Sequence, residues 1–281
     1  MKKAFSLVEL SIVILIIGII AAGITQGSRL IRQSYLKTAQ NLTQSSPVSS
    51  IEDLRLWYET SMETSFLSTE SEDTRSISVW NDINPQGVTK NNAAGTTTTR
   101  PTYRENTINR LPAIRFDGTD DFMTFDGTIL ANTNYTIFVV EQRRDDGGGN
   151  PSYFFAGTNG ITNNNLHIGY RDTDTITHAH YLNDLDYNIS AYTIPIPRIH
   201  TFMFSTSAGK KYWMNGGVNP DASNASQTTA LESYVGAALG RYSPTYYNGD
   251  IAEVIIFTRA LKIEERQSVE NYLSKKYAIT L

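Results

Sequence analysis

Acidic residues gather in three short turn-like segments, at residues 117–121, 172–174 and 184–186. Calcium needs six to eight oxygen ligands, which clustered carboxylates can supply in part. Turn aspartates more commonly cap backbone amides, which is the alternative at all three segments. Asp120 and Asp121 are the best candidates for calcium ligands. Calcium is the only cofactor that the sequence suggests.

Two histidines, His178 and His180, flank Ala179 at the spacing of a strand. Alternate residues of a strand share a face, so the two imidazoles would lie on one side. They could form two ligands of a metal site, but no third ligand is evident nearby. We therefore expect a solvated face with Ala179 inward. His167 and His200 are isolated and are expected to be packed or surface residues.

Glycoside hydrolysis usually needs two placed carboxylates, which a run such as Glu-x-Asp-x-Glu would present on one face of a strand. No such run occurs; Glu70 and Glu72 lie in a polar segment, and Glu253 is alone on its strand. We therefore predict that the chain is not an enzyme. Sugar binding would instead use exposed aromatic rings, for which several tyrosines are available: Tyr181, Tyr187, Tyr192, Tyr242, Tyr246 and Tyr247.

One carboxylate, Glu9, lies inside the apolar segment 5–24. Twenty helical residues cover about 30 Å, the hydrocarbon thickness of a bilayer. A carboxylate within such a helix costs about 2–3 kcal/mol, so it usually marks a function. No small-residue cleavage site follows the segment, unlike a plain signal peptide. An ordinary signal anchor remains the alternative.

These residues resemble the N-terminus of a type IV prepilin. Lys2 and Lys3 match the basic leader, and Ala4 stands where that family usually has glycine. The resemblance implies cleavage between Ala4 and Phe5 and N-methylation of Phe5. Glu9 would then be the fifth residue of the mature chain, where the family keeps a glutamate. Its partner would be the N-terminal amine of the neighbouring subunit in a filament.

The composition sets further bounds. The chain has 281 residues, a formal net charge of −4 and no cysteine. Nothing in the bulk charge suggests nucleic-acid binding. The outer domain must be stable without disulfides, which says nothing against export. No other apolar stretch is long enough to span a membrane, so one span and one exported domain is the simplest plan.

The secondary-structure elements that would position these residues follow from the pattern of apolar, aromatic and turn residues along the chain. We predict a leader at 1–4, a transmembrane and assembly helix at 5–43, a linker at 44–50 and a β-sandwich at 51–281. Short β-branched and aromatic runs separated by turn residues favour the sandwich. The runs 137–140 and 254–257 are apolar throughout and predict central strands. Helices are expected at 51–61 and 264–277.

The outer domain resembles laminin-G-like, concanavalin-A-like jelly rolls. The resemblance rests on the run from Leu111 to Phe122, the Tyr212–Gly216 segment, Leu239-Gly-Arg, and the run from Asn248 to Leu261 with its closing helix. It implies a mainly β fold: a long N-terminal helix followed by an antiparallel sandwich with a C-terminal helix. Such jelly rolls often hold calcium at their loop rim.

Together these patterns predict a type IV pilin-like subunit, of the minor kind, that displays a lectin-like domain for adhesion or ligand binding. The alternatives are a pseudopilin of a type II secretion or DNA-uptake machine and a membrane-tethered carbohydrate-active enzyme. Expected partners are other pilin subunits, the prepilin peptidase and methyltransferase, and a surface glycan or protein. The chain would reside in the bacterial inner membrane before assembly, and then in a pilus or pseudopilus with its C-terminal domain outside the cytoplasm.

Overall fold

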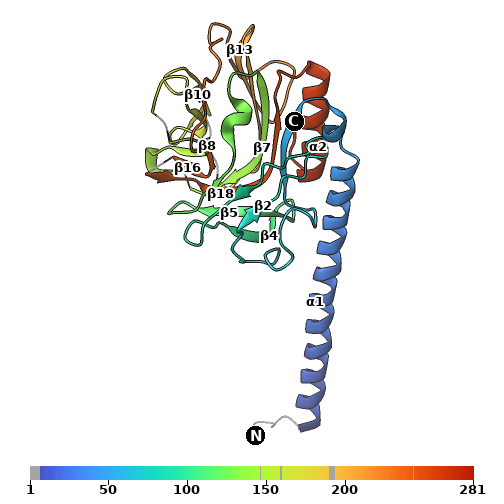
Figure 1. Ribbon diagram of the computed structural model, residues 1–281. Coiled ribbons are helices and arrows are strands. Elements are labelled where there is room, and N and C mark those ends of the chain that lie inside the picture. The colour runs from blue at the N-terminus through green and yellow to red at the C-terminus, as the bar shows by residue number, and fades with distance from the viewer. Residues whose placement is uncertain (1–6, 146, 159, 190–193, 243) are drawn as a thin grey trace.

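The computed structural model begins with a long helix. It describes residues 7–145, 147–158, 160–189, 194–242 and 244–281. Helix α1 (Leu7–Gln44) has 38 residues, and Figure 1 shows it projecting from the rest of the molecule. Residues 7–24 are all exposed, although most of them are apolar. Among the described residues, α1 is the one helix long and apolar enough to cross a membrane. A signal sequence near the N-terminus would meet the same criteria of length and composition.

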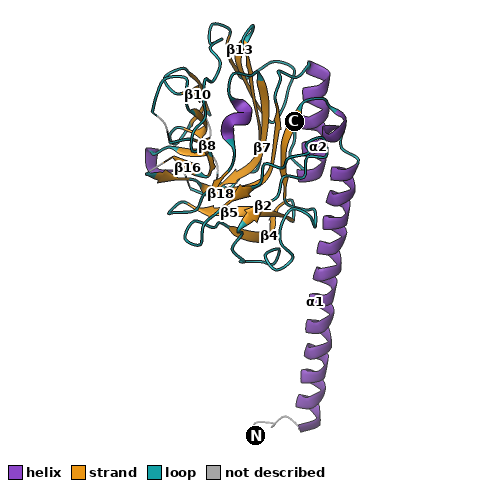
Figure 2. Ribbon diagram, viewed as in Figure 1, coloured by secondary structure: helices purple, strands orange, loops and turns teal. Residues whose placement is uncertain are grey.

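Most of the remaining chain forms two facing antiparallel sheets (Figure 2). The first sheet, sheet A, contains β14 (Ala222–Asn224), β13 (Gly209–Met214), β12 (Arg198–Ser205), β7 (Tyr135–Arg143), β18 (Asn248–Phe257), β5 (Leu111–Asp117) and β4 (Thr102–Ile108), with β1 (Leu54–Glu59) also paired to β18. The second, sheet B, contains β11 (Asp184–Asn188), β10 (Thr175–His180), β9 (Leu166–Tyr170), β8 (Ser152–Ala156), β15 (Ala238–Leu239), β6 (Met123–Thr124), β3 (Ala93–Ala94) and β2 (Val79–Trp80). This arrangement confirms the predicted fold class.

The central strands of sheet A are buried on both faces. In β7, Ile137 and Val139 point into the core between the sheets, whereas Phe138 and Val140 point to the opposite side. A strand covered on both faces must be apolar at every position, and one covered on a single face alternates. Strands β7 and β18 are accordingly central in the sheet, as their unbroken apolar runs predicted.

A second core covers the outer face of sheet A. Helix α2 (Ile263–Tyr277) contributes Val269 and Leu273, the 3₁₀ turn η1 (Pro47–Ser50) contributes Val48, and the end of α1 contributes Ala39. Figure 1 shows α2 beside the C-terminal part of α1. The sandwich is therefore built around sheet A, with sheet B on one side and the helices on the other.

The helix predicted at residues 51–61 is wrong, because this segment forms strand β1. Leu56 and Tyr58 enter the core between the sheets, and Leu54 and Trp57 enter the core under α2. Pairing with β18 satisfies the backbone of β1 while both of its faces are buried. Tertiary burial on two sides therefore outweighs the local helical spacing of these apolar residues.

A buried ionic cluster, formed by Glu59, Glu253 and Lys276, lies under α2. The Nζ atom of Lys276 donates to both carboxylates, at 2.8 Å from Glu253, and to Thr43 of α1 at 2.8 Å. The hydroxyl of Tyr272 donates to Glu253 at 2.9 Å. The three charged side chains are at most 1% exposed. The cluster therefore joins α1, β1, β18 and α2 at one point.

Candidate functional site

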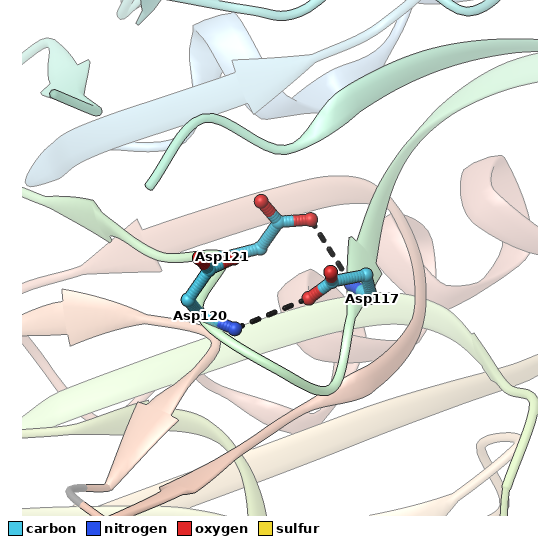
Figure 3. A group of neighbouring side chains, drawn as sticks. All are labelled: Asp117, Asp120 and Asp121. Carbon is cyan, nitrogen blue, oxygen red and sulfur yellow. Dashed lines mark hydrogen bonds between the residues drawn. The ribbon is translucent and has the colours of Figure 1, made fainter. Parts of the chain in front are cut away.

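The acidic turn at residues 117–121 follows β5 and brings three carboxylates together (Figure 3). Oxygens of Asp117, Asp120 and Asp121 lie within 4.8 Å of one another. The carboxylate of Asp121 accepts from the backbone amide of Asp117 at 3.0 Å, and that of Asp117 accepts from Thr119 at 2.8 Å. The turn thus shows the amide capping expected of turn aspartates, with further carboxylate oxygens left over.

Asp121 is the buried carboxylate of this turn, whereas Asp117 and Asp120 are exposed. Its burial, together with the nearby Asp117 carboxylate, raises the pKa of Asp121 to about 7. Calcium–oxygen distances of about 2.3–2.6 Å place two ligands of one ion at most about 5 Å apart, so the spacing of the three carboxylates fits a calcium ion. A cation would also relieve the mutual repulsion of the carboxylates. Calcium binding through Asp120 and Asp121 stays a prediction.

A cage of rings surrounds His167 on the outer face of sheet B. Leu166 and Ile168 point into the core, so His167 between them points outward. Its ring stacks on Tyr153 at a centroid distance of 5.3 Å and an interplanar angle of 8°. Edge contacts follow with Tyr242 at 4.7 Å and with Tyr181 at 5.7 Å.

Burial lowers the pKa of His167 to about 4, so its imidazole is neutral at physiological pH. The Nε2 atom of this ring is buried and has no hydrogen-bond partner within the described part of the chain. Tyr153 and His167 are almost fully covered, whereas Tyr181 and Tyr242 are partly exposed. The cage thus has two partly exposed rings, Tyr181 and Tyr242, above two buried ones, Tyr153 and His167.

The aromatic row continues toward the acidic turn. Tyr242 belongs to β16 (Arg241–Tyr242), which pairs with β17 (Thr245–Tyr246) and packs against β8. The guanidinium of Arg241 lies 3.8 Å from the centroid of the Phe122 ring, and Phe122 contacts Tyr246 at 6.5 Å. We use the name aromatic face for this set of residues: Phe122, Tyr153, His167, Tyr181, Tyr242 and Tyr246.

Polar side chains border the aromatic face at the β10–β11 hairpin. Arg171 forms ion pairs with Asp184 and, at 3.5 Å, with Asp186. It also donates to the hydroxyl of Thr177 at 3.2 Å. All four are on or beside strands whose opposite face enters the core. Partly exposed rings beside charged hydrogen-bonding groups form the combination that binds sugars, because a sugar ring has an apolar face and a polar edge.

The structure separates the tyrosines that the sequence offered for sugar binding. Tyr181, Tyr242 and Tyr246 lie on the aromatic face, whereas Tyr247 is fully buried. Tyr187 packs on Tyr212 at 5.5 Å, at the margin of the core. Tyr192 lies outside the described residues.

The expectation for His178 and His180 is wrong, because both side chains are fully buried. Their Nε2 atoms each lie 2.7 Å from the hydroxyl of Tyr135 on the facing sheet. Burial lowers the pKa of both imidazoles, and that of His180 falls to about 3. One hydroxyl can donate to one ring and accept from the other, so the pair forms a neutral interior bridge between the sheets.

A second interior network surrounds Glu141 and was not foreseen from the sequence. Its carboxylate accepts from Tyr170 at 2.8 Å, from Tyr247, and from Nε2 of His200 at 2.9 Å. The other ring nitrogen of His200 lies 2.8 Å from the hydroxyl of Tyr212. All five side chains are at most 1% exposed. The network is therefore out of reach of a substrate in this conformation.

The N-terminal processing residues, Ala4 and Phe5, lie outside the described residues. Glu9 lies in the first turn of α1 and is exposed along with the apolar residues around it. Its predicted role in assembly stays a prediction.

Comparison with known proteins identifies similar folds but no family for the chain. No protein-family model matches the chain, and a search of curated proteins finds no significant match. Among solved structures, the chain is similar to Trypanosoma rangeli sialidase in complex with sialic acid, at 14% identity and a TM-score of 0.55 over 91% of this chain and 40% of that one. The same sialidase in complex with 2,3-difluoro-KDN gives 13% identity and a TM-score of 0.55 over 89% and 39%.

A third similar structure is the binding domain of Paraclostridial Mosquitocidal Protein 1, with 12% identity and a TM-score of 0.55 over 80% of this chain and 52% of that one. The chain thus spans about two fifths of the sialidase chains and about half of the Mosquitocidal Protein 1 chain. At these identities the likeness concerns the fold alone. It supports a β-sandwich jelly roll of the kind found in binding domains.

The prediction that the chain is not an enzyme is contradicted by the similar sialidase structures, because sialidases are glycoside hydrolases. The prediction rested on the missing Glu-x-Asp-x-Glu run. Sialidases use a tyrosine nucleophile, so the absence of a carboxylate strand does not exclude glycoside hydrolysis.

Proposed function

We propose that the chain is a pilin-like subunit, of the minor kind, which assembles through α1 and displays the sandwich as a carbohydrate-binding domain. The observation that carries this proposal is α1 itself. Its first eighteen described residues, 7–24, are exposed and mostly apolar. A helix that is apolar all round needs a bilayer or other helices as its surroundings. Its C-terminal end is fixed to the sandwich through Thr43 and the ionic cluster.

In this proposal the chain is inserted in the inner membrane, cut between Ala4 and Phe5, and then transferred to a filament. Glu9 would pair with the N-terminal amine of the neighbouring subunit and so set the axial stagger. The cost of a carboxylate in an apolar helix supports such a role, because pairing offsets that cost. The membrane-capable length of α1 supports the location.

Co-expression with a prepilin peptidase tests the processing step. We expect the purified chain to begin with N-methylated Phe5, as measured by mass spectrometry of the N-terminal peptide. A chain that still begins with Met1 would exclude the pilin proposal. A pseudopilin of a secretion or DNA-uptake machine would be cut in the same way, and incorporation into surface filaments separates the two.

The aromatic face is the proposed ligand site of the displayed domain, and a glycan is the proposed ligand. Tyr181 and Tyr242 present partly exposed rings, and Arg171 with its two aspartates supplies hydrogen-bonding groups beside them. The similar structure of a sialidase with sialic acid bound supports a carbohydrate ligand at the level of fold. The acidic turn at the end of the same row is the proposed calcium site.

A glycan array with the full-length chain in detergent tests the ligand proposal. We expect Tyr181→Ala and Tyr242→Ala each to weaken binding of the best glycan about tenfold, taking the stacking of a ligand on one aromatic ring to be worth about 1–3 kcal/mol, as it is for nucleobases. Tyr35→Ala is the matched control, since Tyr35 is an exposed tyrosine on α1. Equal binding by all four proteins would exclude the aromatic face as the site.

A carbohydrate-active enzyme is the second candidate function, favoured by the likeness to sialidases. Hydrolysis of a sialoside or another glycan in a substrate panel would support it. The activity must be lost when Asp184 and Asp186, the carboxylates beside the aromatic face, are both changed to asparagine. Activity that survives this change would place any catalytic site elsewhere.

A further inference from the structure

A cleft lined by three arginines lies where α1 meets the β4–β5 hairpin. It has a volume of about 470 Å³. Its walls are formed by Ser28, Arg29, Ile31 and Arg32 of α1 and by Asn106 and Arg110 of the hairpin. Arg29 and Arg110 are exposed, and the guanidinium of Arg110 lies 5.0 Å from the centroid of the Tyr35 ring.

The cleft carries an excess of positive charge. Arg32 forms an ion pair with Glu105, and the neighbouring Arg104 pairs with Asp73 at 3.4 Å. Neither Arg29 nor Arg110 has a carboxylate within ion-pair distance in the described part of the chain. Arg110 donates one long hydrogen bond, of 3.4 Å, to the hydroxyl of Tyr35, which does not neutralise its charge. Two guanidinium charges therefore face the cleft without a carboxylate beside them, and guanidinium groups bind phosphate with paired hydrogen bonds.

The position of the cleft along α1 indicates which anion reaches it. The apolar segment ends at Ile24, and Arg29 lies five residues, or about 7.5 Å, further along the helix axis. The headgroup layer on one side of a bilayer is about 5–7 Å thick. Arg29 thus lies at the outer edge of the headgroup layer when α1 spans the membrane, and its side chain leans toward the N-terminus of the helix, back into that layer. Ile31 adds an apolar wall beside the charged groups, and it is 53% exposed.

We propose that this cleft binds the phosphate of an anionic phospholipid on the outer side of the membrane that α1 spans. Arg29 and Arg110 hold the phosphate from opposite walls of the cleft. A bound lipid would fix the sandwich against the membrane surface before the subunit leaves the bilayer. The inference rests on the membrane span of the proposed function, and it does not depend on cleavage or filament assembly.

Native mass spectrometry of the full-length chain in detergent, titrated with phosphatidylglycerol or phosphatidylcholine, tests the proposal. We expect the wild-type chain to prefer phosphatidylglycerol. Each arginine near an anionic lipid contributes about 1 kcal/mol, so Arg29→Gln/Arg110→Gln should weaken phosphatidylglycerol binding roughly thirtyfold and leave phosphatidylcholine binding unchanged. The control Arg144→Gln/Lys262→Gln removes the same charge from exposed positions of the sandwich and should bind like the wild type.

Three results would overturn the proposal. The first is equal binding of the two lipids by the wild-type chain, and the second is an equal loss in the cleft variant and its control. The third is displacement of phosphatidylglycerol by an equal concentration of glycerol phosphate, which would show a site for free phosphate. Carbonate extraction of membranes tests the span separately, and N-terminal processing tests the pilin proposal separately. An uncut chain that still retains phosphatidylglycerol would exclude the pilin proposal and leave the lipid site standing.

Discussion

Replacing Lys276 by methionine probes the point at which the N-terminal helix is fixed to the sandwich. The change keeps a long apolar side chain and removes the ammonium group that bridges Glu59, Glu253 and Thr43. The two carboxylates remain buried, at most 1% exposed, and lose the cation that they share. We expect a large loss of stability, because an unpaired charge in a protein interior is costly.

The size of the loss follows from the burial of the cluster. Removing one partner of a buried ion pair costs about 3–5 kcal/mol. Each kcal/mol lowers the Tm of a domain of about 200 residues by about 2–4 °C, so the expected fall is about 6–20 °C. The hydroxyls of Tyr272 and Tyr277 still donate to Glu253 at 2.9 Å, which favours the lower half of that range.

Thermal unfolding of the full-length chain in detergent measures the effect, with Lys275→Met as the control. Lys275 is the exposed neighbour on the same helix, so its replacement should change the Tm by no more than about 2 °C. Equal shifts for the two variants would refute the reasoning.

The pH dependence gives a second check on the same variant. Burial and the nearby Glu59 carboxylate already raise the pKa of Glu253 in the folded chain. Without Lys276 this pKa rises further, so the folded state binds more protons than the unfolded state and is stabilised as the pH falls. The deficit of Lys276→Met relative to the wild type should therefore shrink between about pH 8 and pH 5. A deficit that does not change over this range would argue against unpaired carboxylates as its cause.

Three further changes address other parts of the molecule. Glu9→Ala should leave membrane insertion intact while lowering incorporation into filaments, measured by the subunit content of sheared pili; normal incorporation would make Glu9 a bystander. Calcium should raise the Tm of the wild type and not of Asp121→Ala, and the rise should be larger above pH 7, because the pKa of Asp121 is about 7 and protons compete with the cation below it. No shift with calcium or chelator would remove this site. Tyr135→Phe should lower the free energy of unfolding by about 2 kcal/mol, since it leaves His178 and His180 without their shared partner. Because burial lowers the pKa of His180 to about 3, the unfolded state takes up the proton first, and stability should fall as the pH drops below about 6.5. A stability that stays flat between about pH 6.5 and 4 would contradict the burial of these rings.

The central strands could be predicted because each contains an unbroken run of apolar residues. Strands β7 and β18 are apolar at successive positions, which only a sheet covered on both faces requires. Helix α2 could also be predicted, from its acidic first turn, its basic last turn and the helical spacing of its apolar residues. The segment that forms β1 could not be predicted in this way, because Leu54, Leu56 and Trp57 fit the spacing of a helix as well as that of a strand. The strand forms because the segment pairs with β18.

The site residues were harder to predict, because their orientation depends on partners far away in the sequence. The pair His178 and His180 shares a strand face, which the spacing showed, but the choice of face depends on Tyr135 in the other sheet. Ile176 lies on the same face of β10 as the two histidines, because alternate residues of a strand share a face. Its apolar side chain is buried, so it was the local indication that this face points into the core. The cage around His167 had no local signal, since its rings come from β8, β16 and the β10–β11 turn.

The attachment of α1 also has a mechanical consequence. A pull transmitted from a filament to a ligand held on sheet B must enter the sandwich at the C-terminal end of α1. From there it divides between two routes: the covalent path into β1, which pairs with β18 from Leu54 to Glu59, and the bridge from Thr43 to α2. Both routes converge on β18 and its ionic cluster, close to the middle of sheet A. The tether therefore loads a central strand of sheet A rather than an edge strand, and the hydrogen bonds of β18 to β7 and β5 on its two sides resist the pull.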